Sequence, residues 1–252
     1  MDPKTILNKL FLKAKSKDEF EYICALLRIR GMESAGWDPF EETQHLFNDI
    51  VLLSQAPLKG DTQVRLLLFI YCHITEVDAI YCVLENMLRT IEGERCSIAP
   101  FRHLYGRRKN ILDSRPPSAK QVVQALQQHT QKLNEQELSD LLTWMFNDQV
   151  RNAFFHSDYT IFKDEFRSRE ANFRTNNVIT KSMKINDLIE LINRGLNFFQ
   201  GFMSTYYEHR LSYKEPKIIY GRIGANGGSE PVELLVSSNG GGVFGFKSIN
   251  GK

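Results

Sequence analysis

The sequence has little cysteine and no cysteine pair. Its four cysteines lie far apart at Cys24, Cys72, Cys82 and Cys96, with no C-x-x-C spacing. Small secreted domains depend on closely spaced disulfides, whereas isolated cysteines in apolar helical sequence behave as small hydrophobic residues. This pattern excludes a disulfide scaffold and predicts a reducing, cytoplasmic compartment.

Long apolar runs and a strong net charge are also absent. The longest uninterrupted apolar run is LLLFIYC at 66–72, and the formal net charge is +2. A membrane-spanning helix needs about 20 apolar residues. The N-terminal stretch MDPKTILNKLFLKAKSKDEF is charged and amphipathic, without the apolar core of a secretory signal. We therefore expect a soluble protein without a membrane partner, whose electrostatic interactions are local.

Several catalytic signatures are missing as well. The six histidines are scattered, no H-E-x-x-H or Cys/His ligand spacing occurs, and no G-x-S-x-G turn is present. The glycines near the C-terminus match neither a dinucleotide fingerprint nor a phosphate loop. We expect neither a metal nor a cofactor.

What the sequence does contain is mostly helical. Ser16 with Glu19 forms a predicted capping box, and Asp38 followed by Pro39 predicts another helix start. The stretch 62–91 has no glycine or proline and is apolar nearly all round, which predicts one long central helix. Further helices are expected from Ser118, from Asn134 through residue 156, and over 185–212.

Short β segments interrupt this pattern in two places. DYTIFKDEF and NNVITKSM predict a hairpin before the last long helix, and KIIYGRI, VELLVSS and GVFGFKSI predict a small sheet at the end. The predicted fold is thus mainly α, a helical bundle with an inserted β-hairpin and a small C-terminal β element. We divide the chain into N-terminal helices (1–56), a helical domain (57–213) and a glycine-rich β appendage (214–252).

The strongest functional signal is RNAFFH at 151–156. An arginine offers a fork of donors suited to phosphate, and histidine can both accept and donate a proton near neutral pH. An amide such as that of Asn152 can orient a neighbour or hold a phosphate oxygen. Together, Arg151, Asn152 and His156 suit RNA cleavage without a metal, in which a deprotonated 2′-OH attacks the adjacent phosphorus.

Helical geometry limits how these residues can cooperate. Five residues place Arg151 and His156 roughly 140° apart around a helix and about 7.5 Å apart along it. Within one helix they do not share a face. A site using both requires either a helix that frays at its end or a second copy of the chain across a two-fold axis.

Arg151, Asn152 and His156, in a helical domain with a long apolar helix and a closing helix at 185–212, resemble the motif of the HEPN superfamily (higher eukaryotes and prokaryotes nucleotide-binding). There an Arg, often followed by a polar residue, precedes a His by four to six residues. The resemblance implies a helical bundle that forms a homodimer, joins two motifs in a cleft and cleaves RNA without a metal. It also implies toxin, phage-defence or RNA-processing roles, with an antitoxin or other protein as a further partner.

Alternatives remain open for each part of this hypothesis. The domain could be a catalytically silent module that binds nucleotide, RNA or a protein, or a scaffold in a defence or toxin system. His156 could simply cap a helix end, with Arg151 paired to Asp148. His73 with Glu76 is interpreted as a buried hydrogen-bonded pair, with a supporting role at the site as the alternative.

A basic stretch lies between helices, at FRHLYGRRKN. It predicts phosphate-binding residues at Arg102, Arg107 and Arg108, although such a run is commonly a solvated surface. Glu85 and Arg89 are expected to form an ordinary helical ion pair.

Overall fold

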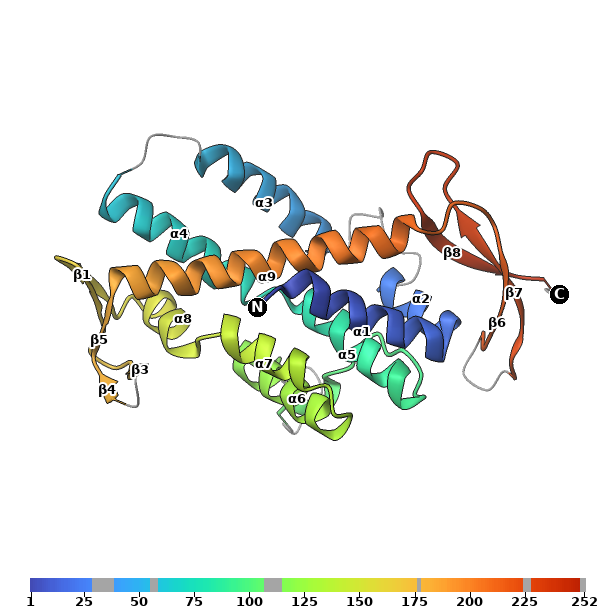
Figure 1. Ribbon diagram of the computed structural model, residues 1–252, viewed down its shortest axis with the longest axis horizontal. Coiled ribbons are helices and arrows are strands. Elements are labelled where there is room, and N and C mark those ends of the chain that lie inside the picture. Colours follow the sequence, from blue (N-terminus) through green and yellow to red (C-terminus); the bar gives the residue numbers. More distant parts are fainter. Residues whose placement is uncertain (29–38, 55–58, 107–114, 176–177, 224–227, 250–252) are drawn as a thin grey trace. The chain divides into compact units, whose positions relative to one another are not determined.

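The computed structural model contains two compact units built from interleaved segments. It describes residues 1–28, 39–54, 59–106, 115–175, 178–223 and 228–249 (Figure 1). The first unit comprises Met1–Glu41, Asp78–Ser139 and Gly201–Lys252, and the second comprises Glu42–Val77 and Asp140–Gln200. The sequence predicted three consecutive segments (1–56, 57–213 and 214–252). Their boundaries differ from those of the two units, and this division stays a prediction.

Most described residues are helical, which confirms the mainly α class. The helices of the first unit are α1 (Pro3–Lys17), α2 (Glu19–Leu27), α5 (Asp78–Glu92), the short 3₁₀ turn η1 (Arg102–Leu104) and α6 (Ala119–Lys132). The second unit holds most of α3 (Pro39–Ser54), α4 (Asp61–Ile74) and α8 (Asp148–Phe155). Two helices, α7 (Gln136–Met145) and α9 (Ile185–Leu211), contribute residues to both units.

In the first unit the N-terminal helices pack against the end of α9. The Phe11 ring of α1 meets Tyr22 and Phe202 edge-on at 6.4 and 6.3 Å. The predicted capping box of Ser16 and Glu19 is wrong. Ser16 lies inside α1, and Asp18 caps α2 by accepting a hydrogen bond from the Glu21 amide.

The predicted C-terminal sheet is confirmed. Strands β6 (Ile218–Gly221), β7 (Glu230–Val236) and β8 (Val243–Ser248) form an antiparallel sheet in the order β6-β7-β8. The sheet packs on α2 (Figure 1). The Phe20 ring of α2 and the Phe246 ring of β8 lie 4.8 Å apart. The β appendage is therefore part of the first unit.

The long helix predicted over 62–91 is wrong, because the chain breaks at Thr75–Val77 between α4 and α5. The Thr75 hydroxyl donates to the Cys72 carbonyl, and the amides of Glu76 and Val77 bond three residues back, which tightens the turn. Among the described residues no single helix is long and apolar enough to cross a membrane, and α4 and α5 pass that test only when taken together.

The helix predicted from Asn134 through residue 156 is likewise interrupted. It divides into α7 and α8, since Asn147 caps a new helix with its side-chain oxygen. The buried Tyr71 hydroxyl fills the break, donating to the Met145 carbonyl and accepting from the Asn147 amide. Gly195 of α9 lets Tyr71 fit, because a Cβ at that position would lie 2.7 Å from its ring.

The segment between α8 and α9 forms two β-hairpins, whereas the sequence predicted one. Strands β1 (Thr160–Phe162) and β2 (Glu165–Arg167) form the first, and β3 (Phe173–Thr175) and β4 (Val178–Thr180) form the second. The returning strand β5 (Ser182–Lys184) pairs with β2 and gives a sheet in the order β1-β2-β5. All five strands thus lie in the segment that connects α8 to α9.

Candidate functional site

The site predicted from the sequence lies on α8, a short helix with well-defined ends. At its C-terminus the Asp158 amide donates to the Ala153 carbonyl (2.8 Å) and the Ser157 amide donates to the Phe154 carbonyl (3.0 Å). These bonds form a Schellman motif, with Ser157 in the left-handed region at φ 53°. His156 is thus the C-cap of an intact helix end, and the helix does not fray.

Arg151 is held by neighbours on two elements. Its Nε donates to Glu76 Oε1 (2.5 Å) in the break after α4, and its Nη1 donates to Asn152 Oδ1 (2.8 Å). The guanidinium carbon lies 5.0 Å from the centre of the Phe155 ring. The partner expected for a structural Arg151 was Asp148, and the ion pair instead reaches Glu76, 75 residues away in sequence.

This contact also settles the interpretation of His73 and Glu76. A hydrogen-bonded pair between them is wrong, because Glu76 binds Arg151, and no described residue bonds the buried Nε2 of His73. Burial lowers the pKa of His73, which keeps its ring neutral.

Asn152 and His156 line one cavity of ≈ 300 Å³, together with Gln149, Ala153, Asp158, Glu170 and Ala171. The side chain of His156 is exposed and that of Asn152 is half-buried. Arg151 is absent from this wall and is linked to it through Asn152. Within one chain, the structure therefore brings Asn152 and His156 to the same cavity and leaves Arg151 beside it.

Two neighbouring side chains have structural roles. Burial raises the pKa of the Cys72 thiol to about 12, so it stays protonated and is no nucleophile. The Tyr159 ring stacks between Phe154 and Phe166, with centroids 5.8 and 5.3 Å away. Tyr159 thus connects the first hairpin to α8 through ring contacts.

A second, larger cavity of ≈ 660 Å³ begins directly after His156. Its wall is formed by Ser157, Asp158, Tyr159, Thr160, Glu165, Arg167, Ser168, Arg169, Lys181 and Ser182. Asp158 belongs to both cavities. The sequence did not single out this cavity because its cations are spread over β2, the turn after it and the residue before β5.

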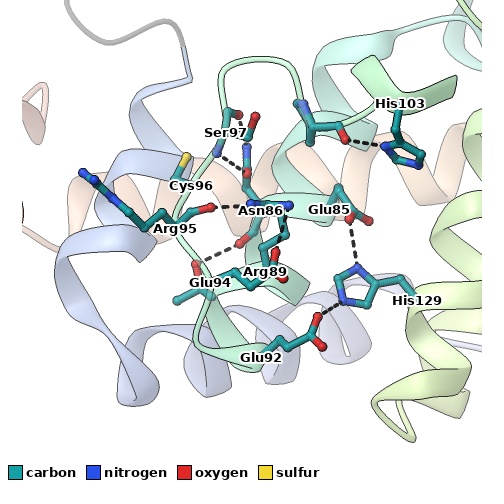
Figure 2. Close-up of polar contacts among 12 residues, drawn as sticks. Glu85, Asn86, Arg89, Glu92, Glu94, Arg95, Cys96, Ser97, His103 and His129 are labelled. Atoms are coloured by element: carbon teal, nitrogen blue, oxygen red, sulfur yellow. Dashed lines mark hydrogen bonds and ion pairs between the residues drawn. The ribbon is translucent and has the colours of Figure 1, made fainter. Parts of the chain in front are cut away.

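Of the three predicted phosphate-binding arginines, the structure describes one. Arg102 is exposed in η1 of the first unit, and Arg107 and Arg108 lie outside the described residues. The neighbouring His103 donates a hydrogen bond from its ring Nδ1 to the Pro100 carbonyl at 3.2 Å (Figure 2). The assignment of Arg102, Arg107 and Arg108 stays a prediction.

The first unit contains a separate titratable cluster around His129 (Figure 2). Its Nδ1 lies 2.9 Å from Glu85 Oε1 and its Nε2 lies 3.1 Å from Glu92 Oε2, so one imidazole joins α6 to two carboxylates of α5. The hydrogen bond to Glu85 raises the pKa of His129. Glu85 does not pair with Arg89 as expected, because Arg89 pairs with Glu94.

This cluster is an internal clamp. The His129 side chain is 12% exposed and that of Glu85 is 10% exposed. Among the described residues, no group of three or more His, Cys, Asp or Glu side chains is arranged to hold a metal ion.

Comparison with known proteins adds no relative: the chain matches no protein-family model, no curated protein and no solved structure.

Proposed function

We propose that the protein is a metal-independent endoribonuclease of HEPN type that acts as a homodimer. The observation that carries the proposal is the cavity lined by Asn152 and His156, with Arg151 hydrogen-bonded to its wall through Asn152. A base, an amide and a guanidinium in this order are the groups that phosphodiester transfer needs.

In the proposed reaction the neutral His156 imidazole takes the proton of an RNA 2′-OH. The 2′-oxygen then attacks phosphorus, the bond from phosphorus to the 5′-oxygen breaks, and an imidazolium returns a proton to that oxygen. Arg151 stabilises the charge that develops on the phosphate through Nη2, the nitrogen not engaged by Glu76 or Asn152. The products are a 2′,3′-cyclic phosphate and a 5′-OH.

The geometry of α8 supports the proposed homodimer. Because the Schellman motif keeps the helix regular up to His156, fraying does not bring His156 onto the face of Arg151. A second copy across a two-fold axis can place its His156 beside Arg151 of the first. Each of the two equivalent sites then holds Arg151 of one copy and His156 of the other, and that histidine serves first as the base and then as the acid.

The ion pair between Arg151 and Glu76 favours one alternative, a catalytically silent module of the same fold. A guanidinium already paired with a carboxylate has less charge to offer a phosphate. In that case the domain binds nucleotide, RNA or a protein partner and leaves RNA intact.

Incubation of the purified chain with end-labelled single-stranded RNA in EDTA distinguishes the two. For the nuclease we expect cyclic-phosphate ends from the wild type and from His45→Ala, which alters an exposed histidine of α3, and none from His156→Ala. Intact RNA with a folded, dimeric wild type would favour the silent module. Equal cleavage by His156→Ala would remove this residue from the mechanism.

A further inference from the structure

The larger cavity next to His156 has a polar wall built from one short stretch of chain. All of its residues lie between Ser157 and Ser182, in the segment that connects α8 to α9. Hydroxyl groups of serine and threonine alternate there with three cations. At ≈ 660 Å³ the cavity is large enough for a ligand of several functional groups, and more than a single phosphate.

The three cations keep donors that can bind an incoming anion. Lys181 Nζ donates to the Glu170 carbonyl at 3.2 Å, and no carboxylate of the described residues neutralises it. The Arg169 side chain is 84% exposed, with its Nε 3.4 and 3.7 Å from the nearest carboxylate oxygens, on Glu170 and Asp158. Arg167 pairs with Glu165 on the strand and remains half-exposed.

The two carboxylates of the wall, Asp158 and Glu165, already bind other groups of the protein. Asp158 accepts from the Ser168 hydroxyl (2.7 Å) and from the Glu170 amide (2.8 Å), and these bonds lower the pKa of Asp158. Glu165 lies between Arg167 and Lys184. Asp158 thus fixes the turn that carries Arg169 and separates the two cavities.

We propose that this cavity binds the sugar-phosphate backbone of single-stranded RNA next to the scissile phosphate. The inference rests on the proposed function, because the neighbouring cavity supplies Asn152 and His156. Lysine and arginine bind phosphates, and hydroxyl groups can bond to phosphate oxygens and to the 2′-OH. A strand that passes from the smaller cavity into the larger one meets Lys181 and Arg169 on its flanking phosphates.

Binding can be measured separately from cleavage. The probe is a short fluorescent RNA with 2′-O-methyl groups, which cannot be cleaved by 2′-OH attack, and the readout is anisotropy in EDTA over a range of salt concentrations. The test variant is Arg169→Gln with Lys181→Gln. The matched control, Lys9→Gln with Arg65→Gln, removes the same charge from exposed ion pairs whose residues do not line the cavity.

We expect the test variant to bind about tenfold more weakly at moderate salt, with the slope of log affinity against log salt reduced by about 1.4, as for two lost phosphate contacts. The control is expected to bind like the wild type. Equal binding by the test variant, equal weakening in the control, or no binding by the wild type at low salt would each overturn the proposal.

The outcome is independent of the cleavage assay. If RNA binds through Arg169 and Lys181 but stays intact in the cleavage experiment, the nuclease proposal fails and the backbone site stands. If the wild type cleaves RNA and the test variant binds normally, the backbone site fails and the nuclease stands.

Discussion

The orientation of the Arg151 side chain depends on Glu76, which lies 75 residues away in sequence. Glu76 accepts the Nε hydrogen bond and thereby fixes the direction in which Nη2 points. A misplaced catalytic group can cost orders of magnitude in rate. We expect Glu76→Ala to lower the single-turnover rate of RNA cleavage at least about tenfold, and Glu76→Gln, which keeps an acceptor, to lower it less.

The matched control for this prediction is Glu190→Ala. It removes a carboxylate from another glutamate-arginine pair of the second unit, with Arg194 on α9. Cleavage at the wild-type rate by Glu76→Ala would mean that Arg151 is oriented without Glu76.

Ser157 follows the candidate histidine in a strained backbone conformation. Its φ of 53° lies in the left-handed region, which costs a non-glycine residue about 1 kcal/mol. We expect Ser157→Gly to raise the free energy of unfolding by about 1 kcal/mol, measured from the midpoint of urea denaturation. Ser157→Ala keeps a Cβ and should bring no gain, so equal stability of both variants would argue against strain at this position.

At the scale of elements, local signals predicted the start of α6 and the end of α9 well, although the capping box of Ser16 and Glu19 was wrong. Ser118 and Gln121 form a capping box at the start of α6, and α9 ends at Leu211, close to the predicted residue 212. The breaks after α4 and after α7 were missed because they depend on tertiary partners. The Tyr71 hydroxyl, for example, bonds the backbone of Met145 and Asn147, and no sequence pattern within 134–156 predicts these hydrogen bonds.

The clamp between α5 and α6 makes stability depend on pH. Since the folded protein holds the His129 proton more tightly than the unfolded chain, this stabilisation is complete below the ordinary pKa of about 6.5 and is lost as pH rises through the raised folded pKa. We expect the difference in unfolding free energy between wild type and His129→Gln to shrink with rising pH, measured by urea denaturation.

The contribution of His209 to stability depends on pH in the opposite direction. Its Nε2 donates to Asn8 Oδ1 (2.8 Å) while Nδ1 accepts from the Tyr22 hydroxyl, and burial lowers its pKa. Its contribution is present above the ordinary pKa and is lost as pH falls. The loss caused by His209→Gln should therefore grow as pH rises toward about 6.5 and then level off, whereas that of His129→Gln should be level below about 6.5 and decline above it. A loss that falls with rising pH for His209→Gln, or one that grows for His129→Gln, would contradict the respective assignment.

At the scale of the whole molecule, the proposed dimer makes a quantitative prediction. If Arg151 of one copy works with His156 of the other, a heterodimer of the Arg151→Ala and His156→Ala chains has one intact site and one doubly altered site. Mixing the inactive chains under exchange should restore about a quarter of wild-type activity. If each site draws both residues from one chain, mixing restores nothing.

The candidate site was only partly predictable. Arg151, Asn152 and His156 lie within six residues and form a recognisable motif. Glu76 was considered only together with His73, and its contact with Arg151 was not predicted, because the fold alone brings the turn after α4 to α8. Arg169 and Lys181 were missed for the same reason, since strand pairing between β2 and β5 brings their segments to one cavity.

The interleaved order of the segments has a consequence for synthesis on the ribosome. The last segment of the second unit ends at Gln200, whereas the first unit needs Gly201 and the residues after it. Until these emerge, Phe11, Tyr22 and Phe20 lack Phe202, His209 and Phe246, the rings that cover them. The unit with the candidate site is thus free to fold first, while the N-terminal helices keep aromatic surface exposed and are the part of the nascent chain that a chaperone would hold.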